Sequence, residues 1–191
     1  MRPYALAVAA LIALATAAAA PAASAPVAVK DPEGDAGKGK LDIARVSLGP
    51  AADGRLRAAV TMARPWSPRD LLGHSGPPGT VCVRMWLSGR RPSSSAPDYL
   101  ACATVATDND KLKGTVMHER AGDLPERAGS ASATMVSSRT AVLRFAQSAI
   151  GRPATLRFGF EALPAGCPAL SCTDTAPDAP RSARLVLRSS S

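Results

Sequence analysis

Aromatic side chains are scarce in this chain of 191 residues: two Trp, two Tyr and three Phe make up 4% of it. A protein that stacks sugars or bases needs exposed aromatic rings. Beyond the N-terminal stretch six aromatic residues remain, and most of them are expected in the core: Trp66, Trp86, Tyr99, Phe145, Phe158 and Phe160. The composition therefore argues against a sugar-stacking platform and leaves Trp66 and Trp86 as the candidate contact residues. Trp86 falls on the same strand face as Cys82, where we expect it to cover a disulfide, the alternative being an exposed contact residue.

Histidine is equally scarce, with only His74 and His118 present. Two histidines therefore allow few Ser/His/Asp or Cys/His catalytic sets. The segment Gly73-His74-Ser75-Gly76-Pro77 resembles a G-x-S-x-G nucleophile elbow, but proline stands where the last glycine is needed. We expect no enzyme and assign no catalytic residue.

Helical periodicity is absent from residue 27 onward, because no long segment sustains apolar residues at i, i+3, i+4 and i+7. Short runs of alternating apolar and polar residues dominate, and turn-forming dipeptides such as Asp53-Gly54 separate them. They predict about nine short strands, at residues 41–48, 55–62, 81–87, 99–106, 111–118, 130–136, 141–146, 155–162 and 182–188. The expected fold is an all-β sandwich, jelly-roll or immunoglobulin-like, with a closed barrel as the alternative.

The N-terminus has the three parts of a signal peptide: one basic residue in the first four, an uncharged apolar run over residues 5–20, and small residues over 21–26. An uncleaved anchor would need about 20 strongly apolar residues, and this run is shorter and mostly alanine. We therefore predict a cleaved signal peptide over residues 1–22 and a single domain over 23–191. The mature chain is expected to be secreted and extracellular, without a membrane span.

The four cysteines allow three pairings in an oxidising compartment: Cys82, Cys102, Cys167 and Cys172. If the two strands predicted around the first pair form a hairpin, Cys82 falls directly opposite Cys102. The second pair lies close enough in sequence to close a small loop. We predict these two disulfides, and we exclude a zinc site because neither the CxxC nor the Cys/His spacing of such sites is present.

One segment near the mature N-terminus carries acidic residues at relative positions 1, 3, 5 and 12, the spacing of a calcium-binding loop: Asp31, Glu33, Asp35 and Asp42. It departs from an EF-hand because Ala36 stands where the loop needs glycine and Asp42 stands where it needs a bidentate glutamate. No flanking helices are predicted either. An EF-hand is therefore excluded.

A looser calcium site remains as an alternative, in which Asp174 or Asp178 joins Asp31 and Asp35, because chain ends often meet in sandwich domains. The ordinary expectation for such carboxylates is a role in turns and caps. Apart from calcium, no cofactor is expected.

The chain is basic, with a formal net charge of +8, and loss of Arg2 with the signal peptide leaves 22 − 15 = +7 on the mature chain. Such a charge suits an anionic partner such as a surface polymer. The arginines are, however, scattered at near-alternate strand positions, which favours a solvated outer sheet face. We expect a monomer with no nucleic-acid partner.

Four stretches together resemble a group of uncharacterised secreted proteins of high-GC Gram-positive bacteria: DPEGD...LDIARVSL, VCVRMWL...YLACATV, RFAQSAIGRPATLRF and GCPALSCTDTAPDAP. The resemblance covers nearly the whole mature chain, and the paired cysteines and the DTAPD segment are its most specific parts. It implies a signal peptide and a β-sandwich, with no assigned activity or ligand.

These observations predict a secreted, non-catalytic module with an interaction or structural role and an unknown ligand. The alternative is a module that binds a cell-wall, carbohydrate or other anionic surface polymer. The positive charge, Trp66 and Trp86 suggest this alternative. A secreted hydrolase is the third hypothesis, and it would require an acid or a serine that converges with His74 or His118.

Overall fold

The computed structural model describes residues 24–35, 39–73, 76–87, 96–106, 110–120, 122–167, 172–178 and 181–187. They form eleven strands: β1 (Val27–Lys30), β2 (Ile43–Pro50), β3 (Arg55–Met62), β4 (Thr80–Trp86), β5 (Tyr99–Ala106), β6 (Lys111–His118), β7 (Glu126–Met135), β8 (Thr140–Ala146), β9 (Thr155–Leu163), β10 (Asp174–Ala176) and β11 (Ala183–Val186). Two short 3-10 helices, η1 (Pro68–Leu71) and η2 (Gln147–Ile150), interrupt the loops. No helix in this part of the chain is long and apolar enough to cross a membrane.

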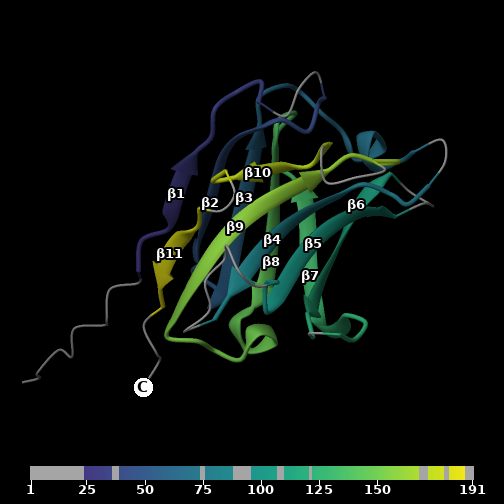
Figure 1. Cartoon of the computed structure of the whole chain (residues 1–191). Coiled ribbons are helices and arrows are strands. Elements are labelled where there is room, and N and C mark those ends of the chain that lie inside the picture. Colours follow the sequence, from purple (N-terminus) through teal and green to yellow (C-terminus); the bar gives the residue numbers. More distant parts are fainter. Residues whose placement is uncertain are drawn as a thin grey trace, which may run out of the picture.

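All eleven strands belong to one antiparallel sheet with the order β1-β2-β3-β8-β7-β6-β5-β4-β9-β10, in which β11 also pairs with β9. The sheet folds back on itself, so that β9, β4 and β5 lie in front of β2, β3 and β8 (Figure 1). Its two edges meet, since β10 contacts β2 and β11 contacts β1. The fold is thus an all-β sandwich that approaches a barrel, and the predicted fold class is confirmed. We call the line along which the edges meet the seam.

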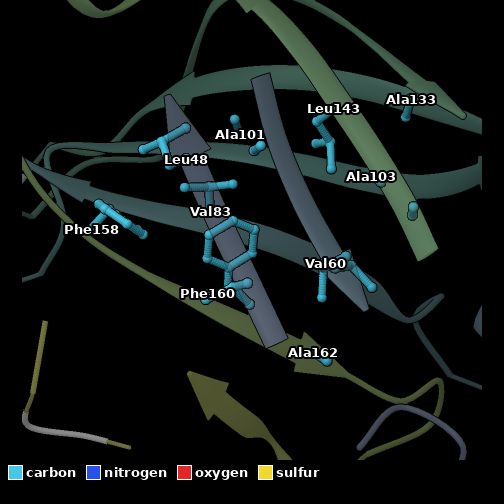
Figure 2. Packing of buried hydrophobic residues seen from close by; sticks show 14 of the residues in the cluster. Leu48, Val60, Val83, Ala101, Ala103, Ala133, Leu143, Phe158, Phe160 and Ala162 are labelled. Carbon is cyan, nitrogen blue, oxygen red and sulfur yellow. The ribbon is translucent and has the colours of Figure 1, made fainter. Parts of the chain in front are cut away.

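The core lies between the two layers because each strand turns alternate apolar residues inward. Leu48, Val60 and Leu143 come from the rear strands and point toward Phe158 and Phe160 of β9 (Figure 2). Each of these side chains is buried. Burial of such a side chain contributes roughly 1.5–3 kcal/mol, so this interior supplies the main stabilisation of the fold.

Nine of the strands correspond to the nine that alternation predicts, and β1 and β10 are additional. Those two have four and three residues, which is too short for an alternating pattern to stand out. Both lie at the edges of the sheet, beside the seam.

The predicted disulfides are confirmed. Cys82 of β4 lies in register with Cys102 of β5 and is bonded to it, and Cys167 is bonded to Cys172. No free cysteine remains. Two structural disulfides indicate a non-reducing environment.

The two tryptophans, considered above as contact residues, are both buried. Trp66 is 5% exposed and its indole N–H donates to the backbone oxygen of Arg139 at 3.1 Å. Trp86 is 2% exposed, with the Arg84 guanidinium 5.0 Å from the ring centroid. Its ring lies near Gly159 of β9, so Trp86 is buried and the exposed alternative is wrong, whereas its cover over the disulfide stays a prediction. Neither indole offers a stacking surface.

We expect Cys82→Ser to lower the free energy of unfolding more than Cys172→Ser. The first bridge joins residues 20 apart and the second joins residues 5 apart. The larger ring restrains the unfolded chain more, and the loop-entropy relation gives losses of about 3 and about 2 kcal/mol. Urea denaturation of the cleaved, oxidised proteins, with the liberated thiol blocked, provides the measurement. Equal losses, or a larger loss for Cys172→Ser, would contradict the expectation.

Candidate metal centre

Carboxylates from distant parts of the chain converge at the seam. Asp31 directly follows β1, and Asp42 directly precedes β2. Asp174 opens β10, on the other edge of the sheet, and its Oδ2 accepts a hydrogen bond from the backbone N–H of Ile43 in β2. One aspartate side chain thus joins the two edges.

The turn after β1 and the segment after β10 add one carboxylate each, from Asp35 and Asp178. The carboxylate oxygens of Asp31, Asp35 and Asp178 lie within 4.8 Å of one another, and so do those of Asp35, Asp42 and Asp174. The two groups share Asp35. We call these five residues the acidic centre.

Local backbone geometry holds the first part of this centre in place. The N–H of Asp31 donates to the carbonyl of Ala44 at 3.0 Å, which extends the pairing of β1 with β2 by one residue. Gly34 has φ +93°, a conformation that L side chains rarely adopt, and its N–H donates to Oδ2 of Asp42 at 2.8 Å. The turn therefore folds back onto Asp42.

Three of the five carboxylates are buried: Asp31 is 8% exposed, Asp42 2% and Asp174 5%. Oδ2 of Asp31 and Oδ1 of Asp42 have no hydrogen-bond partner. A buried polar atom without a partner costs roughly 1–3 kcal/mol, and more when it is charged. None of the ion pairs formed within the described ranges includes any of the five aspartates.

The crowding changes the acidity of two members. Burial, followed by repulsion from Asp174 and Asp178, raises the pKa of Asp31 from 3.8 to about 7. Burial also raises the pKa of Asp174, to about 6, against the stabilising hydrogen bond from Ile43. Both shifts have the sign expected when like charges are removed from water without a neutralising partner.

An acidic centre of this composition fits a hard divalent cation. It offers only carboxylate oxygens, the ligands that Ca²⁺ prefers, from up to five side chains on two segments that are distant in the sequence. A cation among them would neutralise the mutual repulsion and give the two unpartnered oxygens a ligand.

The structure brings together all four residues named for the looser calcium site: Asp31, Asp35, Asp174 and Asp178. It adds Asp42, which sequence reasoning had counted as a departure from the EF-hand pattern. The structure buries Asp42 directly before β2, whereas alternation with Leu41 and Ile43 would place its side chain on the polar face, so the sequence pattern carries no signal of its burial. Glu33 is exposed in the turn and belongs to neither group of carboxylates.

Of the two histidines considered for hydrolysis, His118 lies in the described part of the chain, opposite Glu126 in the register of β6 with β7. The imidazole of His118 stacks on the ring of Tyr99, with 4.7 Å between the ring centroids. His74 and Ser75 lie outside the described residues.

In the presence of a chelator, the free energy of unfolding is expected to fall as the pH rises from about 4 to about 7. The raised pKa values of Asp31 and Asp174 mean that the folded state holds protons which the unfolded state has released. Protonation of these two aspartates therefore stabilises the folded state fully below pH 3.8, and this stabilisation is lost as the pH passes through 6 and 7.

The variant Asp31→Asn removes one of these titrations and isolates its effect. At pH 7.5 it should be more stable than the wild type by about 1 kcal/mol or more, and at pH 4 the two should be nearly equal. Denaturant unfolding in EGTA across this range measures the difference, with Asp123→Asn, an exposed position, as the control. A difference between Asp31→Asn and the wild type that does not change with pH would contradict the assignment.

Comparison of this chain with family models, with curated proteins and with solved structures finds no match. The resemblance to secreted proteins of high-GC Gram-positive bacteria stays a prediction. The acidic centre is therefore the feature of the molecule that bears most directly on its function.

Proposed function

We propose that this protein is a secreted, non-catalytic module whose sheet is closed by a calcium ion bound at the acidic centre. The observation that carries the proposal is the convergence of five aspartates on the seam, with two buried carboxylate oxygens that have no partner. The first three aspartates belong to the segment between β1 and β2, Asp174 opens β10, and Asp178 follows β10.

The position of the centre gives the cation a structural role. The Ile43 N–H of β2 donates a hydrogen bond to the Asp174 side chain of β10, and like charges surround this bond. A divalent cation would turn this repulsion into a cross-link between the two edges of the sheet. Because β1 and β10 are the shortest strands beside β11, they depend most on such a link.

Calcium suits the site better than the other common divalent cations. Magnesium demands near-ideal octahedral geometry and loses its water reluctantly, whereas calcium accepts six to eight oxygens in a flexible arrangement. Zinc prefers sulfur and nitrogen ligands, and the acidic centre has neither. Extracellular modules bind calcium with Kd values of about 10⁻⁴–10⁻³ M, so modest affinity is enough for a secreted protein.

Secretion and the non-catalytic character are supported by separate features. The two disulfides fit an oxidising compartment, as does the leader-like N-terminal sequence. The scarcity of histidine and the engagement of all four cysteines in bridges leave few nucleophile and base pairs for catalysis.

Titration of the mature, oxidised protein with calcium tests the proposal. At a free calcium concentration of about 100 times Kd, binding should raise the free energy of unfolding by about 2.7 kcal/mol, which corresponds to a rise in Tm of about 5–10 °C. Magnesium at the same concentration should have a much smaller effect. Isothermal titration calorimetry should give one calcium per chain.

The variant Asp35→Asn is the sharpest probe, because Asp35 belongs to both groups of carboxylates and is exposed, so its substitution leaves the core intact. We expect it to weaken calcium binding at least tenfold. Asp123→Asn makes the same chemical change at an exposed position and should bind calcium as the wild type does. No calcium binding by the wild type at 5 mM, or equal binding by both variants, would refute the proposal.

A further inference from the structure

Positive charge is segregated on one half of the sheet. Strands β1, β2, β3, β6, β7 and β8 contain a single acidic residue, Glu126, which pairs with Arg120. The same strands contain eight basic residues: Lys30, Arg45, Arg55, Arg57, Lys111, Lys113, Arg127 and Arg144. These residues are scattered in the sequence, and only the pairing of the strands brings them together.

The densest part of this charge lies where β3, β8 and β7 are neighbours. Arg57 is directly opposite Arg144 in the register of β3 with β8, and Arg144 is directly opposite Ser132 of β7. Arg55 points to the same outer face, two residues before Arg57. We call the surface formed by Arg55, Arg57, Arg144 and Ser132 the basic face.

The basic face is hollowed and continues on both sides. These four residues, with residues 51–53 of the β2–β3 loop, line an open hollow of about 620 Å³. A second hollow shares Arg55 with it and reaches Arg152. A third hollow shares Ser132 with it and reaches Lys113. Because neighbouring hollows share lining residues, the three lie side by side along the arginine and lysine side chains.

These cations lack partners that would neutralise them. Within the described residues, Arg57, Arg144, Arg152 and Lys113 form no ion pair, and Arg55 has only Asp53 at 4.0 Å, between side chains that are half exposed. Like charges directly opposite one another on adjacent strands destabilise a sheet. The arrangement of Arg57 and Arg144 therefore lowers stability unless an anion lies between them.

We propose that the basic face binds a linear polymer of phosphodiester-linked units. Guanidinium groups bind phosphate oxygens in a bidentate manner, as they bind carboxylates, which suits a chain of repeated oxyanions. The succession of hollows fits an extended chain with repeated charges and not a single small anion. Besides the cations, the lining contains small residues, Gln147, Leu112 and one acidic residue, Asp53 beside Arg55, but no aromatic side chain on which bases would stack. A non-nucleic phosphodiester polymer is therefore the ligand class, and the proposal is independent of the calcium site.

The test measures binding of fluorescein-labelled poly(glycerol phosphate) of defined length to the mature protein by anisotropy, at low and at high salt. We expect binding at low salt that weakens steeply as salt rises, because neutralised phosphates release their counterions. The double variant Arg57→Gln/Arg144→Gln should lose at least tenfold in affinity and show a shallower dependence on salt. Its thermal stability should equal or exceed that of the wild type, since a like-charge contact is removed.

A matched control lies on the other half of the sheet, where Arg157 of β9 is directly opposite Arg184 of β11. Arg157→Gln/Arg184→Gln removes the same charge from the same kind of cross-strand pair, which lines none of the three hollows. This variant should lose less than threefold. An equal loss in both double variants would show that net charge alone drives binding and would overturn the proposal. So would the absence of binding at low salt, or equal or tighter binding of oligothymidylate of the same number of phosphates.

Discussion

Repulsion among the five aspartates of the acidic centre is the constraint on which the closure of this fold depends. The sheet folds over a large apolar core. The two edges of the sheet differ from the core in two respects. Strands β1 and β10 are short, and the carboxylates of the acidic centre that face one another beside them carry the same charge. Burial makes this repulsion stronger by removing the carboxylates from water. A bound cation would convert this repulsion into a cross-link at the seam, while the disulfide joins β4 to β5, and β9 lies between β4 and the β10 edge.

The chain has a net positive charge, but its acidic and its basic side chains are each concentrated at a separate place. Acidic side chains from residues 31–42 and 174–178 gather at the seam, while arginine side chains of β3 and β8 gather on the outer face around Arg57 and Arg144. Each concentration costs free energy in the isolated protein, and each is the kind of site that a ligand of opposite charge would stabilise. The two sites would take a small hard cation and a long anion, and they belong to different strands. A module held together by one ion and attached through another surface is consistent with a non-catalytic extracellular role.

Sequence alone predicts the parts of this structure that depend on local pattern. Alternation along each strand locates nine strands, and the hairpin of β4 and β5 places Cys82 opposite Cys102. Pairs of residues that meet only through strand order are not predictable in this way. The register that sets Arg57 opposite Arg144 joins strands far apart in the chain, so the arginines look scattered. Asp42 was set aside because it does not match the last ligand of an EF-hand, although burial at the start of β2 places it in the centre. Burial likewise removed Trp66 and Trp86 from the candidate contact residues, since alternation gives the face of a strand but not what covers that face.

Hydrogen exchange with and without calcium tests the closure of the seam most directly. Amide protection reports the free energy of local opening, so a cation that links the two edges should slow exchange in the strands beside it. We predict that calcium slows exchange of the amides in residues 27–35, 42–50 and 172–178, and that the amide of Ile43 changes most. The amides of β6 and β7, far from the acidic centre in the order of the sheet, should exchange at the same rate in calcium and in EGTA. Equal protection of the seam in both conditions, or a calcium effect spread evenly over the sheet, would contradict the claim that a cation closes it.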